Sequence, residues 1–177
     1  MKTTKIVIAL GAAAALGVAV LPLASYAANN YTATTNITVS INSTFSITAT
    51  ESVTATATNN GPVVDMSPVV TVITNNSGGF TLKAKTTHTD GPALISGSNQ
   101  IAAGSPSTGT SAWGMKGGAL GTTYTALKTT DTTVLTTSAP TDTSGVATTF
   151  TIGVSASPSQ AAGTYAGTIT WTGTANS

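Results

Sequence analysis

The sequence predicts an all-β protein: an antiparallel β-sandwich, Ig-like or jelly-roll-like, preceded by a helical signal peptide. Three observations support this prediction. Apolar and polar residues alternate with period two over long stretches, threonine fills most of the polar positions, and clusters of Gly, Ser and Pro separate the stretches. Threonine is β-branched and fits the pleated, half-exposed surface of a strand.

The first 27 residues have the features of a secretory signal peptide. Lys2 and Lys5 precede an apolar run over residues 6–23, and Ser25-Tyr26-Ala27 provides small residues for cleavage after Ala27. The alternative is an uncleaved membrane anchor, because a run of about 18 apolar residues approaches the length of a membrane span. We expect cleavage, and therefore a chain that is secreted to the extracellular cell surface and has no membrane segment.

Charge and cysteine content argue against several classes of function. The chain has no cysteine, so it has neither disulfides nor thiolate metal sites. Removal of Lys2 and Lys5 leaves four lysines against five acidic residues, with no arginine and no run of basic residues. A nucleic acid partner needs a basic surface, so we expect none.

The first element after the signal peptide is an alternation that runs from Thr32 to Asn60, which is too long for one strand. It lapses at Asn42-Ser43-Thr44, and this lapse predicts two strands, over 31–41 and 45–56.

The lapse also sets the predicted domain boundaries: a signal peptide at 1–27, an N-terminal extended strand segment at 28–43 and a β-sandwich domain at 44–177. The extended segment carries an apolar row of Ile37, Val39 and Ile41. This row is a candidate donor strand that adds to an open sheet edge of another copy. The alternative is that it folds back as the first strand of its own sheet.

Two further pairs of strands are predicted as hairpins. The run at 69–73 and the alternation at 80–85 flank the turn cluster Asn75-Asn76-Ser77-Gly78-Gly79, whose glycines tolerate positive φ. The alternations at 150–154 and 165–171 form the second pair. Shorter strands are predicted at 93–95, 113–116, 124–128 and 133–136.

The inward positions of these strands predict the core. Val70 and Val72 are preferred over Val69 and Ile73 for the inner face of the first hairpin. The predicted core residues are Phe45, Ile47, Val70, Val72, Phe80, Leu82, Phe150, Ile152, Tyr165, Ile169 and Trp171.

The ending AAGTYAGTITWTGTANS resembles the last strand of small secreted bacterial surface β-sandwiches, namely WxL-type cell-wall domains and spore-coat-U-type pilus subunits. The stretch VTVITNNSGGFTLKAKT is similar to the hairpin that such proteins carry before a Trp-containing loop, here SAWGMKGG. The resemblance implies a surface or pilus role. Leu is missing after both Trp113 and Trp171, and the cysteines common in coat-U-type subunits are missing too.

The chain has few side chains that could act in catalysis. The chain has one histidine, and its carboxylates are scattered, so we expect no enzyme, no cofactor and no metal site. His88 and Asp90 could be a general base and the acid that orients it, as half of a catalytic site, or a weak metal site. The alternative is a solvated hairpin end with its turn at Asp90-Gly91-Pro92. Trp113, in a Gly/Ser-rich loop, is a candidate glycan contact, and the alternative is a buried tryptophan.

Two functions remain open at this point. The first is a secreted structural or adhesive surface protein, such as a fibre, pilus or coat subunit whose partner is a second copy of itself. The second is a monomeric module that binds glycan or attaches to the cell wall, with cell-wall glycan as its partner. The row at Ile37, Val39 and Ile41 favours the first function, and Trp113 permits the second.

Overall fold

The structure is a computed structural model, and it describes residues 34–87 and 91–177. The chain divides into two units, Met1–Val39 and Ser40–Ser177. The described part of the first unit, residues 34–39, has no assigned secondary structure and is exposed. The signal peptide expected at 1–27 lies outside the described residues. No helix among the described residues is long and apolar enough to span a membrane.

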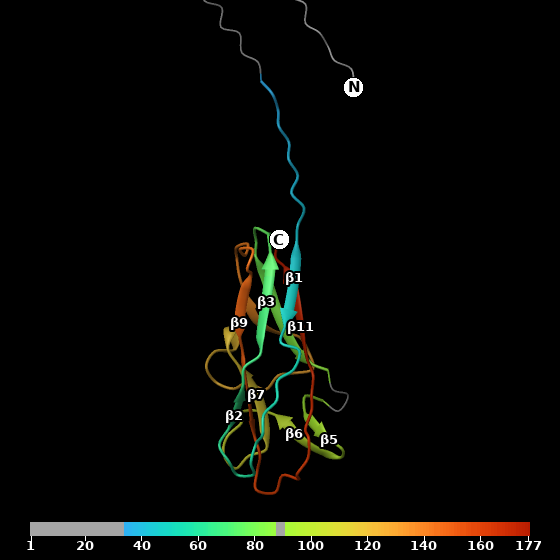
Figure 1. Cartoon of the computed structure of the whole chain (residues 1–177), viewed down its shortest axis with the longest axis vertical. Helices are drawn as coiled ribbons and strands as arrows, with labels where there is room; N and C mark the ends of the chain where they lie inside the picture. Colours follow the sequence, from blue (N-terminus) through green and yellow to red (C-terminus); the bar gives the residue numbers. More distant parts are fainter. Residues whose placement is uncertain (1–33, 88–90) are drawn as a thin grey trace, which may run out of the picture. The chain divides into compact units, whose positions relative to one another are not determined.

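The second unit is nearly all-β, as predicted (Figure 1). One 3-10 turn, Gly118–Leu120, is the only helical element among its described residues. The strands of this unit are β1 (Phe45–Ala49), β2 (Val64–Met66), β3 (Val69–Thr74), β4 (Phe80–Thr86), β5 (Leu94–Ser96), β6 (Asn99–Ala103), β7 (Ala112–Lys116), β8 (Thr132–Thr136), β9 (Val146–Thr149), β10 (Thr151–Ser155) and β11 (Ile169–Ala175).

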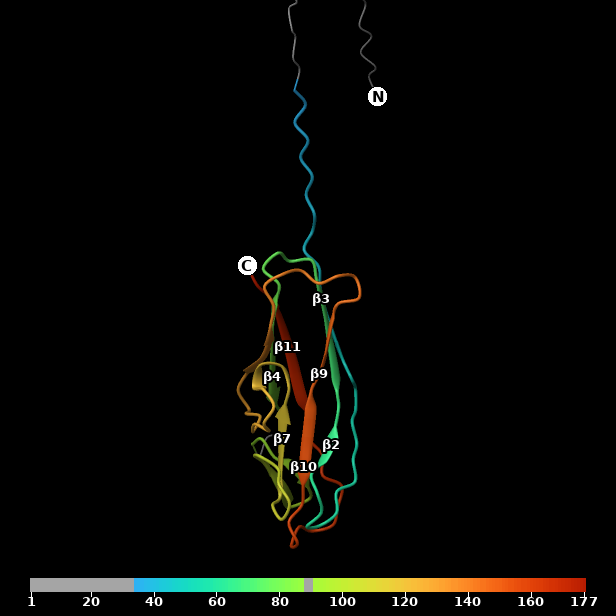
Figure 2. The same cartoon turned by 90° about the vertical axis from the view of Figure 1, so that its left-hand side faces the viewer.

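These strands form three sheets, with the orders β1-β3-β9, β2-β10-β7-β6-β5 and β11-β4-β8. Neighbouring strands are antiparallel, except that β6 and β7 run parallel over a short stretch. β9 runs on into β10 through Phe150, so one continuous chain contributes to two sheets (Figure 2). The Phe150 N–H donates to the Pro68 carbonyl at this crossing.

The two predicted hairpins are wrong. β3 pairs with β1 and β9, whereas β4 pairs with β11 and β8, so the Asn75–Gly79 connection passes from one sheet to another. The glycine prediction holds locally, because Gly79 has φ of 73° and its N–H donates to the Asn76 carbonyl. The later pair fails in the same way, since β10 pairs with β2 and β7 and β11 pairs with β4.

The passage of the chain from one sheet to another at Asn75–Gly79 has a clear physical benefit. Both strands that it joins carry an apolar face, and placing them in different sheets lets the two faces meet in one hydrophobic cluster. Within a single hairpin, both faces would lie on the same side and would need a third layer to cover them. Thr74 is also buried, and its hydroxyl donates to the Thr44 carbonyl at the start of the crossing.

Most of the predicted core is confirmed. The fully or nearly fully buried members are Val70, Val72, Phe80, Leu82, Phe150 and Ile152, and Ile47, Tyr165, Ile169 and Trp171 are partly buried against them. The choice of Val70 and Val72 is correct, since Val69 is 37% exposed. Phe45 is the error: it is 36% exposed because β1 is an edge strand and its first residue lies at the end of the cluster.

Several short elements differ from the sequence prediction. β5, β7 and β8 lie where short strands were expected, but β2, β6 and β9 were not predicted. Residues 124–128 form no strand, and only Thr125 bridges to Met115. β1 ends at Ala49 instead of reaching residue 56. Thr50 still donates its N–H to the Val69 carbonyl, but the residue after it would face Pro68, which has no N–H to donate.

Candidate functional site

The first unusual feature is a row of exposed apolar side chains. Ile37, Val39 and Ile41 are 84%, 77% and 84% exposed, and no strand is assigned to them. Asn36, Thr38 and Ser40 alternate with them, so an extended chain would place all three apolar side chains on one face. We call these three residues the apolar row. Contiguous apolar groups left in water are typical of a surface that binds a partner.

The second feature is an opening between two segments that run in opposite directions. At one end, Phe45 lies against Gly173, where an added Cβ would come within 2.6 Å of the phenylalanine ring. At the other end, the Asn59 side-chain amide donates to the Gln160 carbonyl at 2.9 Å. The chain from 45 to 59 and the chain from 160 to 173 therefore meet at both ends (Figure 1).

Between these two ends, the segments are separated by a groove of about 790 Å³. We call it the open groove, with residues 50–57 and 160–169 as its walls. Its floor consists of core residues from several strands. The apolar residues that line it away from the walls include Met66, Leu94, Ile101, Trp113, Ile152, Val154 and Trp171. Side chains of the hydrophobic core therefore form the floor of the groove, although Ile101, Trp113, Ile152 and Val154 are each at most 8% exposed.

The side chains along both walls of the open groove are small, so they fill little of the space between the two segments. Ala55 and Ala57 occupy positions where the earlier alternation carries Ile or Phe, and the opposite wall is also rich in Ala and Gly. The small residues of the two walls are Ala55, Ala57, Ala161, Ala162, Gly163, Ala166 and Gly167. Our sequence prediction missed the groove, although the change from large to small residues within an unbroken alternation was a usable signal.

Both walls also carry backbone groups that have no hydrogen-bond partner among the described residues. Within residues 34–87 and 91–177, no backbone hydrogen bond is recorded for residues 51–57. On the other wall, Ala166 exchanges both of its backbone hydrogen bonds with Ile95. Successive residues of an extended chain direct these groups to opposite sides, so those of Tyr165 and Gly167 face away from Ile95. Unpaired edges of this kind are templates for an added strand.

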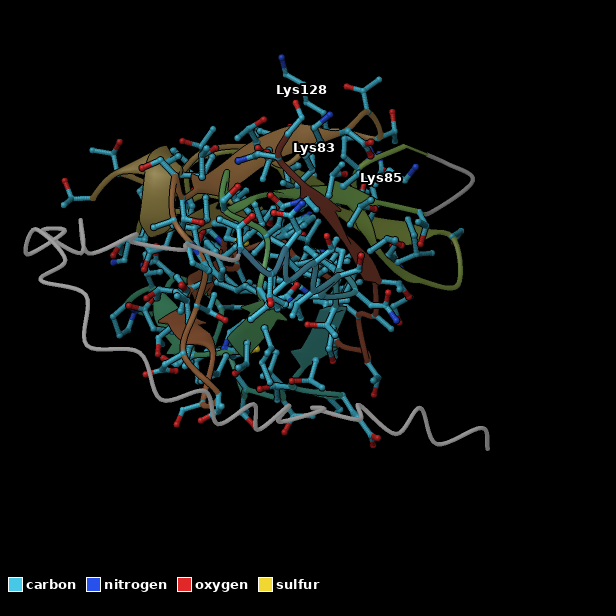
Figure 3. The ribbon with its side chains drawn as sticks, turned by 90° about the horizontal axis from the view of Figure 1, so that it is seen from above. Lys83, Lys85 and Lys128 are labelled. Atoms are coloured by element: carbon cyan, nitrogen blue, oxygen red, sulfur yellow. The ribbon has the colours of Figure 1, made fainter. Side chains whose placement is uncertain are left out.

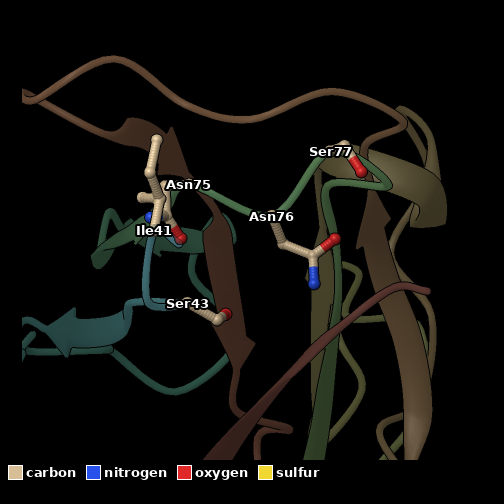
Figure 4. Close-up of a pocket in the computed structure, with 5 residues that line it drawn as sticks. All are labelled: Ile41, Ser43, Asn75, Asn76 and Ser77. Carbon is tan, nitrogen blue, oxygen red and sulfur yellow. The ribbon is translucent and has the colours of Figure 1, made fainter. Parts of the chain in front are cut away.

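One side chain holds the segment that precedes β1. The Thr44 N–H donates to Asn75 Oδ1 at 2.7 Å, and Asn75 Nδ2 donates to the Asn42 carbonyl at 2.8 Å. Residues 41–44 have no assigned turn. Asn75 lines a small hollow of about 280 Å³ together with Ile41, Ser43, Asn76 and Ser77 (Figure 4). We call the two amide contacts the Asn75 clamp.

We expect the Asn75→Ala substitution to release this segment. It removes two exposed hydrogen bonds, so the free energy of unfolding should fall by about 1 kcal/mol, and the Thr44 amide should exchange faster with solvent. Hydrogen exchange and chemical denaturation measure the two effects. Ser77→Ala is the matched control, because Ser77 lines the same hollow and no side-chain hydrogen bond is recorded for it among the described residues. Equal exchange in both variants would contradict the clamp.

Trp113 lies in β7 and is only 2% exposed. Its indole N–H donates to the Pro92 carbonyl at 2.9 Å, which satisfies the polar end of the ring. Stacking on a sugar at the surface requires an exposed aromatic face, and the ring of Trp113 does not offer one. Burial therefore agrees with the interpretation of Trp113 as a core tryptophan.

Three polar side chains, those of Asp65, Lys116 and Tyr124, form a cluster away from the open groove. The Tyr124 hydroxyl donates to Asp65, and Lys116 Nζ lies 3.6 Å from Asp65 and 4.1 Å from the centre of the Tyr124 ring. Burial, and then the bond to Asp65, raise the pKa of Tyr124. The hydrogen bond with Tyr124 is the main cause of a raised pKa for Lys116. Both shifts move the pKa values of Tyr124 and Lys116 further above neutral pH, and the contacts of the three side chains tie β2 and β7 to the chain at Tyr124.

Three lysines gather on one side of the β11-β4-β8 sheet although the sequence has no basic run. Lys83 and Lys85 alternate with the buried residues of β4, and Lys128 follows on the chain that bonds to the end of β4 (Figure 3). Lys85 Nζ lies 3.5 Å from an Asp131 carboxylate oxygen, so part of this charge is neutralised.

The remaining candidates from the sequence are the possible base or metal site at His88 and Asp90. His88 and Asp90 lie outside the described residues. Among the residues that the structure describes, no group of three or more His, Asp or Glu could hold a metal ion. Comparisons of the chain with protein-family models, with curated proteins and with solved structures gave no match.

Proposed function

We propose that the mature chain is a secreted structural or adhesive subunit of a cell surface, a fibre, pilus or coat protein that assembles by strand addition. In this proposal its body is an antiparallel sandwich of the Ig-like or jelly-roll-like kind, and its extended segment is the donor strand. The observation that carries the proposal is the apolar row, in which Ile37, Val39 and Ile41 are all at least 77% exposed.

The energetics favour burial of this row in a partner. Complete burial of a Val or Ile side chain contributes about 1.5–3 kcal/mol, so three such residues contribute about 5–9 kcal/mol before the cost of association. An added strand also supplies backbone hydrogen bonds to an edge that lacks them. Residues 28–43 carry no charge that would oppose this burial.

The alternative, a monomeric module that binds glycan or the cell wall, has less support. The feature that suggested it was an aromatic platform at Trp113, and this ring is buried with its N–H bonded to Pro92. A glycan-binding module also gives no role to three exposed apolar side chains in succession.

The proposal predicts that one charge on the apolar row stops assembly. Val39→Asp should abolish assemblies in size exclusion and negative-stain microscopy and leave the thermal unfolding of the monomer cooperative. Thr38→Asp is the matched control, since it adds the same charge to the neighbouring residue on the opposite face. We expect Thr38→Asp to assemble as the unmodified chain does.

Deletion of Ala28 to Ile41 tests the competing fold-back arrangement. Loss of assembly with a cooperatively folded monomer supports donation to a neighbour. An unfolded monomer would mean that the strand belongs to its own sheet, and a mature chain that never assembles would contradict the proposal.

A further inference from the structure

We infer that the apolar row occupies the open groove of a second copy of this chain. This inference rests on the proposed function and specifies its acceptor. The groove differs from the other free sheet edges in one respect: side chains of the hydrophobic core form its floor. A strand placed there would close the core and would also pair with backbone groups.

The chemistry of the two surfaces matches. The apolar row presents three branched aliphatic side chains, and the floor presents aliphatic and aromatic side chains such as Ile152, Val154 and Trp171. The small Ala residues of the walls leave space for the larger side chains of the row. Among the residues that the structure describes, Glu51 is the only charged residue that lines the groove, and residues 28–43 have no charged side chain.

The backbone groups match as well. An inserted strand has two edges, and it needs a partner chain on each side to satisfy both of them. Residues 51–57 supply one such chain, and Tyr165 with Gly167 supplies part of the other, because the bonds of Ala166 are directed to Ile95. The other free edges of the three sheets offer pairing on one side only.

Two contacts favour a second copy over the chain's own groove. A fold-back would require a turn at residues 42–44, and the Asn75 clamp holds these residues in a conformation without one. It would also place a strand between the start of β1 and the last residues of β11, where Phe45 already lies against Gly173. A segment from another copy breaks neither contact.

Engineered cysteines test this inference cleanly because the chain has none of its own. One population carries Val39→Cys, and a second, mass-tagged population carries Val53→Cys, Ala55→Cys or Ala57→Cys on one groove wall. The two populations are mixed in denaturant, refolded and assembled under reducing conditions, and then oxidised. Since no chain carries both cysteines, a mixed disulfide dimer forms only between copies. The bond requires Cα atoms within about 7 Å of each other.

We expect a mixed dimer for at least one wall position, at a yield at least tenfold above two controls. The first control is Thr38→Cys as the donor, on the opposite face of the segment. The second is Ser144→Cys as the acceptor, in an exposed loop outside the groove.

Two results would overturn the inference, and they are distinguishable. Assemblies that form without a mixed dimer at any wall position mean that the row binds another edge, which leaves the proposed function standing. Failure of the unmodified chain to assemble under the same conditions removes both the inference and the proposed function.

Discussion

Trp113→Ala is expected to lower the free energy of unfolding by about 3–5 kcal/mol, the range measured when large aromatic core residues are truncated. Trp113 is the largest fully buried side chain, and it lies in a central strand of the five-stranded sheet. The substitution leaves a cavity and also removes the N–H that satisfies the Pro92 carbonyl. Denaturant unfolding of the purified chain measures the loss.

Graded controls separate burial from other effects. Trp113→Phe retains most of the apolar volume and loses the hydrogen bond and the five-membered ring, so we expect a smaller decrease of about 1–2 kcal/mol. Trp171 is half-buried with its ring 4.9 Å from that of Phe150, and Trp171→Ala should therefore cost less than Trp113→Ala. Equal stability of Trp113→Ala and the unmodified chain would show that the ring is not in the core.

The fold class could be predicted from the sequence because period-two alternation is a local property of the chain. Val70 and Val72 face inward for the same reason, and the glycine at position 79 adopts the positive φ that its turn requires. Each of these statements depends only on residues close together in the sequence.

Strand pairing could not be predicted, because it depends on residues far apart. The connection Asn75–Gly79 suits a hairpin as well as a crossing between sheets. The choice is made by β1, β9, β11 and β8, which occupy the edges of β3 and β4. Local turn chemistry contains no information about those partners.

Of the two parts of the candidate site, the apolar row could be predicted from the sequence and the open groove could not. The apolar row is visible in the sequence as three aliphatic residues in an uninterrupted alternation. The open groove is formed by two segments more than a hundred residues apart. Several of its floor residues, such as Ile101 in β6 and Trp113 in β7, come from short strands with weak patterns. The change from large apolar residues to alanine at positions 55 and 57 is the feature of the sequence that best indicates the groove.

The second large effect concerns complementation in trans. We expect a synthetic peptide of residues 28–41 to stabilise a chain that begins at residue 42. The compact unit Ser40–Ser177 holds every buried core residue, so the shortened chain retains the core and loses the row. A peptide that binds only the folded state at 100 times its Kd adds about 2.7 kcal/mol. For a domain of this size, that gain corresponds to a rise in Tm of roughly 10 °C.

The same titration identifies where the peptide binds. Trp171 lines the open groove and is half-exposed, so burial of its ring under the peptide should shift its fluorescence to shorter wavelength in a Trp113→Phe background. The control peptide carries Val39→Asp, which places a carboxylate over an apolar floor, and burial of an unpaired charge is costly enough to prevent binding. A rise in Tm with both peptides would indicate non-specific binding. A rise with the unmodified peptide but no spectral shift would place the strand at another edge of the body.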